Sequence, residues 1–254
     1  MKTAHPLIEV TAANVADTGF FCKMSARGKP GYEQKLAWLD ERFAESLQLR
    51  LLSGGERGFV EFIPGDYAWR AIENAAEFIV IHCLWVVGRS KGKGLGRLLL
   101  DEVENYARAS GFAGVAAVAS RGNWLVGPAA LKHHGYSCID SAAPSFDLMV
   151  KRFRGGSGDP RFCGGWEAKA RARPKGLVVY RSAQCPYLDD AVGHARASAD
   201  VAGVRFSEIR LESAADIRAR SPTPYGVYAL VRDGALISYH YLLQKNVAAL
   251  IAGA

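Results

Sequence analysis

A short basic turn rich in glycine, residues 88–97, constrains the fold of this chain more than any other stretch. It reads Gly-Arg-Ser-Lys-Gly-Lys-Gly-Leu-Gly-Arg, follows an apolar run at residues 78–87 and leads into a helical pattern at residues 95–109. Glycines let the backbone approach a ligand closely, and the free N–H groups of a helix start favour negative charge. The turn therefore predicts a pyrophosphate site between a buried strand and a helix. An ordinary strand-to-helix loop that carries cations is the alternative.

Composition narrows the classes of protein that this chain can belong to. Its 254 residues favour two domains, and its net charge of +7 indicates an anionic ligand or general cationic solubility. It has no compact run of lysine and arginine interleaved with aromatic residues and no known nucleic-acid-binding signature, so we expect no nucleic-acid partner. The five cysteines are widely spaced without a CxxC pair, which argues against a disulfide framework and a metal site.

The compartment can also be predicted. The first residues lack the apolar region of a signal peptide, and no apolar run reaches the roughly 18 residues of a membrane span. Reduced thiols are the default for such a cysteine pattern. We therefore expect a cytoplasmic protein without membrane contact, and a homodimer stays open.

The first half of the chain, residues 1–153, predicts a mixed sheet with helices on its faces. We expect helices at residues 14–20, 32–46, 95–109 and 128–134 from their apolar spacing. Strands are predicted at residues 7–11, 49–52, 58–63, 78–87, 114–120 and 145–153. The segment 67–77 fits neither pattern.

A linker and a basic arm, residues 154–175, separate this half from a second, smaller pattern at residues 176–254. The basic part, residues 166–175, predicts a helix or an extended arm. Beyond it, strands are predicted at residues 177–181, 204–211, 225–231 and 236–242, with helices at 188–199, 214–220 and 247–252. The predicted order of this α/β unit is βαβαββα.

The opening turn resembles the motif of the GCN5-related N-acetyltransferase (GNAT) family, in which an apolar strand end is followed by Arg/Gln-x-x-Gly-x-Gly/Ala. Val86, followed by Lys91-Gly92-Lys93-Gly94-Leu95-Gly96, is similar to that pattern, with lysine where arginine or glutamine is usual. The resemblance covers about residues 5–153. It implies that acetyl-CoA places its pyrophosphate on the backbone N–H groups of residues 92–97 and its pantetheine beside a splayed strand, where a backbone N–H polarises the thioester carbonyl. The residues implied to bind it are Leu84, Trp85, Val86, Lys91, Gly92, Lys93, Gly94, Leu95, Gly96, Arg97 and Asn123.

The resemblance also raises the question of which group protonates the departing CoA thiolate. The family's tyrosine falls near Leu131, which cannot donate a proton. His133, His134 and Tyr136 are the nearby candidates, unless the thiolate leaves without assistance. The alternative for the two histidines is that they are exposed residues at a helix end, where a cation is favourable.

Transfer to an amine requires a base that removes the proton of the ammonium. Glu61 alternates with Val60 and Phe62 on its strand, so it points away from both, toward a cleft or toward solvent, and it is the first candidate. The other candidates near the sheet centre are Asp66, Glu73, Glu77 and His82. His82 is the second candidate, although a histidine in a buried run is more often a hydrogen-bonded core residue. Cys83 could carry an acyl group, but a strand cysteine is more often a small core residue.

The second half resembles the thioredoxin superfamily in its element order and in Cys185 at a helix start. The whole arrangement is similar to a bacterial acetyltransferase group with a YoaP-type C-terminal domain, an impression carried by residues 64–70, 81–87 and 184–187. The helix start is expected to lower the pKa of the Cys185 thiol. Leu188 stands at the place of a second cysteine, so a dithiol cycle within this motif is excluded. A monothiol role stays open beside a purely structural domain.

These features predict an N-acetyltransferase that moves an acetyl group from acetyl-CoA directly to the amine of a small molecule, such as an amino acid, a metabolite or an antibiotic. Two other classes of protein remain open. One is a non-catalytic acyl-CoA-binding or sensor protein, which the absence of the tyrosine suggests. The other is a thiol-handling protein that uses Cys185.

Overall fold

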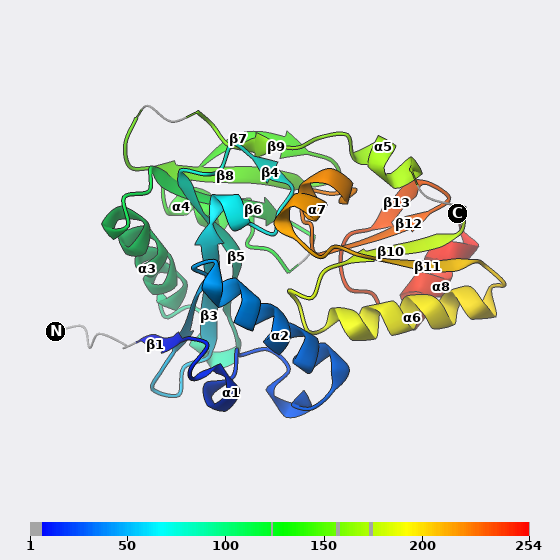
Figure 1. Cartoon of the computed structure of the whole chain (residues 1–254), viewed down its shortest axis with the longest axis horizontal. Coiled ribbons are helices and arrows are strands. Elements are labelled where there is room, and N and C mark those ends of the chain that lie inside the picture. The colour runs from blue at the N-terminus through cyan, green and yellow to red at the C-terminus, as the bar shows by residue number, and fades with distance from the viewer. Residues whose placement is uncertain (1–6, 123, 156–157, 173–174, 254) are drawn as a thin grey trace.

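The computed structural model describes residues 7–122, 124–155, 158–172 and 175–253. Its strands form a seven-stranded mixed sheet, a four-stranded mixed sheet and a two-stranded ribbon. The large sheet lies toward the N-terminal end of the molecule and the small sheet toward the C-terminal end (Figure 1). No helix in these described ranges has the length and apolar character needed to cross a membrane.

The large sheet has the order β1-β2-β3-β5-β6-β8-β7, and only the β5–β6 pair is parallel. Six of its strands match the predicted ones within a few residues. The seventh, β7, was not predicted because its residues are mostly exposed at the sheet edge and show no apolar alternation. The strands are β1 (Leu7–Val10), β2 (Gln48–Leu52), β3 (Gly58–Pro64), β5 (Phe78–Val86), β6 (Gly114–Ser120), β7 (Ser137–Ala142) and β8 (Phe146–Arg152).

Helices cover both faces of this sheet. On β3, Val60 and Phe62 belong to the buried cluster that includes helix α3, whereas Phe59 and Ile63 belong to the cluster that includes α2. This alternation is the period-two pattern of a strand buried on both sides. The helices of this half are α1 (Val15–Thr18), α2 (Pro30–Ala44), α3 (Leu95–Ala109) and α4 (Pro128–His133), with 3₁₀ turns η1 (Met24–Ala26), η2 (Gly65–Tyr67) and η3 (Gly88–Ser90).

Two irregularities in β5 shape the site. Strands β5 and β6 pair only from Phe78–Ile81 with Gly114–Ala117, so the rest of β5 separates from β6. On its other side, β5 pairs with β3 through a register shift in which Cys83 and Ile81 face consecutive residues of β3. His82 is therefore the extra residue of a β-bulge, a feature that redirects side chains.

The small sheet has the order β11-β10-β12-β13, with β10 parallel to β11 and antiparallel to β12. The predicted βαβαββα order is present, and α6 packs against α8. Its strands are β10 (Leu177–Arg181), β11 (Phe206–Arg210), β12 (Tyr228–Arg232) and β13 (Ala235–Ser238), and its helices are α6 (Leu188–Val201), α7 (Ala214–Arg220) and α8 (Gln244–Ala252).

The segment predicted as a linker and arm contains regular structure. Strand β9 (Arg161–Phe162) pairs with β4 (Ile72–Glu73), which lies in the segment that fitted neither pattern. Helix α5 (Trp166–Arg171) confirms the helical alternative for the basic stretch. The ribbon and the helix follow the predicted linker composition of residues 154–160, and they tie this segment to both sheets.

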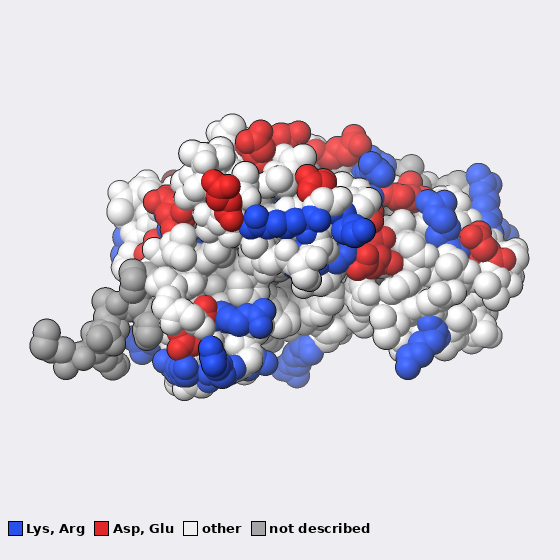
Figure 2. All heavy atoms as spheres, turned by 90° about the horizontal axis from the view of Figure 1, so that it is seen from below, with Lys and Arg blue, Asp and Glu red and all other residues white. Residues whose placement is uncertain are grey.

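The two sheets share one buried hydrophobic cluster, which includes Trp69 and Phe59 from the first half and Leu188 and Tyr228 from the second. Helix α2 also lies directly against the turn before α6, since a Cβ on Gly31 would come within 2.3 Å of the Pro186 carbonyl oxygen. The net positive charge is not gathered into one patch on the face seen from below, where acidic and basic side chains are mixed (Figure 2).

Candidate functional site

A cavity of about 720 Å³ lies where the two halves meet. Its walls come from the loop after α1, helix α2, strands β3 and β5, residues 124–125, the turn before α6 and residues 225–227. This volume suits a small molecule. Many of the side chains that face it are aromatic, sulfur-containing or polar: Phe20, Phe21, Cys22, Lys23, Lys35, Arg57, Phe59, Glu61, Arg70, His82, Cys83, Trp85, Trp124, Gln184, Cys185, Tyr187 and Tyr225.

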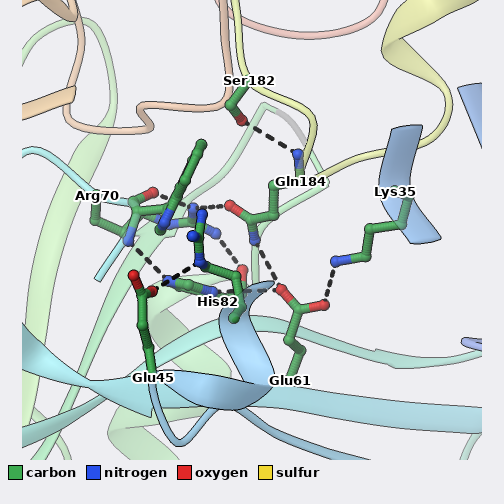
Figure 3. A network of polar contacts seen from close by, with 9 residues as sticks. Lys35, Glu45, Glu61, Arg70, His82, Ser182 and Gln184 are labelled. Atoms are coloured by element: carbon green, nitrogen blue, oxygen red, sulfur yellow. Dashed lines mark hydrogen bonds and ion pairs between the residues drawn. The ribbon is translucent and has the colours of Figure 1, made fainter. Parts of the chain in front are cut away.

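Glu61 stands at the inner wall of this cavity, which settles the direction that the sequence left open. Its Oε2 atom pairs with Nζ of Lys35 at 2.5 Å, and its Oε1 atom accepts a hydrogen bond from Nε2 of Gln184 at 3.2 Å (Figure 3). Glu61 is only 2% exposed and Lys35 only 3%. Burial alone would raise the pKa of Glu61, but Lys35 and His82 outweigh it and lower that pKa to about 2. The carboxylate is therefore a fixed anion and a weak base.

His82 also lines the cavity, and its ring is committed to two contacts. Nε2 accepts the backbone N–H of Trp69 at 2.9 Å, which places the ring proton on Nδ1. Nδ1 lies 3.3 Å from Oε1 of Glu61. Burial lowers the pKa of His82 to about 4, despite the opposing effect of Glu61. The ring is thus neutral and has no free lone pair, as expected for a hydrogen-bonded core histidine rather than a base.

Arg70 connects the two halves behind Glu61. Its Nη1 donates to the carbonyl oxygen of Trp69 at 2.6 Å and to Oε1 of Gln184 at 2.7 Å, and its Nη2 donates to the carbonyl oxygen of His82. Because Gln184 receives the arginine at its oxygen, its amide nitrogen must face Glu61. Arg70 therefore sets the orientation of the amide that holds the carboxylate.

Three thiols face the same cavity from separate elements, and all are free: Cys22, Cys83 and Cys185. Burial raises the pKa of Cys185 to about 11, against the opposing effect of a hydrogen bond from the Tyr187 backbone. It also raises the pKa of Cys22 to about 12 and that of Cys83 well above its usual value. The expectation that the helix start favours a Cys185 thiolate is therefore wrong, because desolvation outweighs the helix terminus. Among the described residues, no cluster of His, Cys, Asp or Glu could hold a metal ion.

The glycine turn has the geometry of an open helix start. Gly92 and Gly94 adopt φ values of +77° and +78°, which favour glycine, and nothing lies within 4 Å of where their Cβ atoms would stand. The first helical hydrogen bond of α3 runs from Leu98 N to Gly94 O at 3.2 Å. The N–H groups of residues 95–97 therefore lack a helical acceptor. Lys91 and Arg97 are exposed beside them, and Lys93 pairs with Glu56 at 2.7 Å.

The part of β5 that separates from β6 carries the other predicted cofactor residues, Leu84, Trp85 and Val86. Trp85 faces the cavity and donates from Nε1 to the carbonyl oxygen of Trp124 at 3.0 Å. Its indole therefore joins the separated part of β5 to the loop that follows β6. A much smaller cavity is lined by residues of both β5 and β6, and Leu131 is also among its lining residues. Asn123 lies outside the described residues.

The remaining predicted catalytic residues are not brought to the large cavity. His133 is exposed at the end of α4, and neither it nor His134 is among the lining residues. Tyr136 is buried in the cluster of α3, away from that lining, and burial raises its pKa. The structure thus groups Glu61 and His82 and leaves His133 and Tyr136 apart from them.

Sequence reasoning missed Lys35, Arg70 and Gln184. Lys35 did carry a signal, since it lies at i+3 from Tyr32 and i−4 from Leu39, within the apolar stripe of α2. A lysine in such a stripe indicates a buried charged partner. The other two lie in segments without periodicity, so only the fold brings them together.

The sequence model described as the acetyltransferase (GNAT) family matches residues 19–123. The chain is 30% identical over 238 residues to the uncharacterized N-acetyltransferase YoaP of Bacillus subtilis (strain 168), covering 92% of this chain and 94% of that protein.

Among solved structures, it is similar to the putative acetyltransferase yncA from Salmonella typhimurium with its cofactor acetyl-CoA, at 17% identity and a TM-score of 0.43, covering 62% of this chain and 98% of that one. It is also similar to the PaiA N-acetyltransferase from Thermoplasma acidophilum in complex with coenzyme A, at 13% identity and a TM-score of 0.36, covering 58% and 99%. The match to YoaP over nearly the whole chain, together with the family match around the glycine turn, shows that this chain belongs to the GNAT family of acetyl-CoA-dependent N-acetyltransferases.

Proposed function

We propose that the protein acetylates the amine of a small molecule by direct transfer, with the acceptor held in the cavity between the two sheets. The observation that carries this proposal is the cavity itself, which extends from the separated part of β5 to the turn at residues 184–187. Its walls are mostly apolar, and its inner end is a buried polar network. A site closed by a second sheet fits a small acceptor better than a protein chain.

In this proposal the donor half of the site is the glycine turn and the strand before it. The N–H groups of residues 95–97, with Lys91 and Arg97 nearby, hold the pyrophosphate of acetyl-CoA. Leu84, Trp85 and Val86 would line the path of the pantetheine, and a backbone N–H of this part of β5, which does not pair with β6, would polarise the thioester carbonyl. When bound, acetyl-CoA supplies the reactive acetyl thioester.

On the acceptor side, we assign Glu61 a structural role and not the role of a base. A carboxylate with a pKa of about 2 is a poor acceptor for the proton of an ammonium. Lys35 pairs with Glu61, and Arg70 donates to the Gln184 amide that holds it, so two cations and one carboxylate leave a net positive charge, which lowers the pKa of a bound amine. The network therefore favours the neutral, nucleophilic form of the acceptor.

We further propose a division of the chain into residues 1–153, which bind the donor, a connecting segment at 154–175, and a thioredoxin-like domain at 176–254 that covers the acceptor. The sheet order β11-β10-β12-β13 and the placement of Cys185 before α6 support the thioredoxin-like assignment. The neutral Cys185 thiol supports a binding role for this domain and not a redox role.

A charge placed at the glycine turn tests the donor site. Gly94→Glu adds bulk and negative charge where the pyrophosphate is placed, so we expect the Kd for CoA to rise at least tenfold in calorimetry. Gly111→Glu is the matched control, because Gly111 also has a φ of +78° and open space, but at the other end of α3. Equal CoA affinity in both variants would refute the placement of the donor. Acetyl-CoA consumption that depends on an added amine tests the transfer itself.

A further inference from the structure

The charges around the cavity do not balance. Four cationic side chains line it, Lys23, Lys35, Arg57 and Arg70, whereas Glu61 is the one carboxylate among its described lining residues. His82 adds no charge, because its Nε2 accepts a hydrogen bond. Two of the four cations have acidic partners. Lys35 pairs with Glu61 at 2.5 Å, and Lys23 pairs with Asp190, outside the lining, at 2.7 Å.

Arg70 is the first cation without an ion pair to a carboxylate of the described residues. It is 1% exposed, its guanidinium donates to the neutral oxygens of Trp69, His82 and Gln184, and it lies 5.4 Å from the ring centre of Tyr225. Its buried Nε has no hydrogen-bond partner within the described chain. A guanidinium keeps its charge when buried, and Glu61, the one carboxylate that lines the cavity in the described residues, is already paired with Lys35, so this end of the cavity keeps a net positive charge. A ligand with a negative charge would offset this charge.

Arg57 is the second cation without an anion, and it stands at the rim. Its side chain is exposed, and its guanidinium lies 6.0 Å from the ring centre of Phe21. The neighbouring carboxylate, Glu56, pairs with Lys93 instead, and no ion pair joins Arg57 to an acidic side chain of the described residues. An arginine in this position can form a bidentate contact with a carboxylate that enters the cavity.

The cavity that both arginines line also has aromatic walls, which include Phe21, Phe59, Trp85 and Trp124. We propose that the acceptor is an amine that also carries a carboxylate on an apolar or aromatic body, and that Arg57 binds this carboxylate while Arg70 supplies a fixed positive field. This inference rests on the proposed function and names its substrate class. Amino acids with large apolar side chains have the required groups.

The test compares pairs of acceptors that differ only in the carboxylate. Phenylalanine, leucine and methionine are each measured against their amides, which keep the amine and lose the negative charge. Calorimetry on the CoA-bound protein gives the Kd, and acetyl-CoA consumption at 232 nm gives kcat/KM. We expect at least one acid to bind tenfold more tightly than its amide. Equal binding within every pair, or binding of neither member, overturns the inference.

Variants then locate the contact. Arg57→Gln is expected to abolish the tenfold preference for the acid, with Arg57→Lys retaining part of it and the Kd for CoA unchanged. Arg205→Gln removes an exposed arginine outside the cavity and serves as the control. A Kd for CoA that rises in Arg57→Gln, with the acid preference intact, assigns Arg57 to the donor and overturns the inference. Binding of the acid without acetyl transfer contradicts the proposed function alone.

Discussion

Gln184 donates a hydrogen bond to Glu61 at 3.2 Å, although 123 residues separate them in the chain. Glu61 lies on β3 of the large sheet, and Gln184 lies in the turn that leads from β10 to α6 of the small sheet. The second half of the molecule therefore reaches into the buried network of the first. Gln184 is a positioning residue, since it acts on the site through Glu61.

Removing the Gln184 amide should lower the stability of the protein and change the pKa of Glu61. Gln184→Leu leaves Oε1 of Glu61 and Nη1 of Arg70 each short of a partner, which we expect to lower the free energy of unfolding by about 2–3 kcal/mol. It should also raise the pKa of Glu61, because a hydrogen-bond donor to the charged form is lost. Urea denaturation measures the first effect, and carbon NMR of the Glu61 carboxyl during a pH titration measures the second.

The control for this variant is Gln34→Leu. Gln34 also joins the two halves, through Asp189 at 3.4 Å and through Arg181, but it does not touch Glu61. This control should lose stability without moving the pKa of Glu61. An unchanged Glu61 titration in Gln184→Leu would show that the amide does not position the carboxylate.

His82 should make the protein less stable in mild acid. Burial lowers its pKa from 6.5 to about 4 in the folded state, so between these values the unfolded chain binds the extra proton. The contribution of His82 to the free energy of unfolding is therefore complete above pH 6.5. It is lost as the pH drops to 4, by about 3 kcal/mol for a shift of this size. His82→Gln should remove that slope in urea titrations at several pH values. His133→Gln, at an exposed histidine, should keep it. A wild-type slope in His82→Gln would contradict the assignment.

The close contact between α2 and the turn before α6 predicts opposite effects for one substitution at two glycines. A Cβ on Gly31 would lie 2.3 Å from the Pro186 carbonyl oxygen, so Gly31→Ala should push the two halves apart and cost about 1–3 kcal/mol. Gly193, within α6, has nothing within 4 Å, so Gly193→Ala should instead gain about 0.5–1 kcal/mol from helix propensity. Urea denaturation compares both, and equal shifts would contradict the packing described here.

Cys185 should react slowly with iodoacetamide at neutral pH. With burial raising its pKa to about 11, the thiolate fraction and the alkylation rate should grow about tenfold per pH unit up to that value. Site-resolved mass spectrometry follows the rate, with the exposed Cys138 as the internal reference. An alkylation rate at Cys185 that levels off below pH 9 would show a reactive thiol with a lowered pKa and would contradict this prediction.

Most of the fold could be predicted because its core elements carry strong periodicity. The apolar stripe of α2 and the alternation on β3 follow directly from the sequence, and so does the strand-turn-helix at residues 78–109. Strand β7 was not predicted, because an exposed edge strand needs no apolar alternation. The β4–β9 ribbon was not predicted, because two-residue strands leave no periodic signal in the sequence.

The site could be predicted only in part. Glu61 and His82 were identified because a charge and an imidazole are conspicuous within apolar strands. Their partners Arg70 and Gln184 come from irregular segments, and such contacts depend on how the two sheets pack. The pKa of Cys185 was predicted in the wrong direction because the sequence shows the helix that follows but not the burial around the thiol.

The cavity wall is divided between two sheets, so segments far apart in the sequence contribute to its two ends. The groups proposed to hold the donor lie within residues 84–97, whereas the turn at residues 184–187 and residues 225–227 complete the wall of the cavity proposed to hold the acceptor. Changes in the later segments can reshape the acceptor pocket and leave the donor strand and turn untouched. New acceptor preferences are therefore open to the protein through its second half, without any rebuilding of the machinery that delivers the acetyl group.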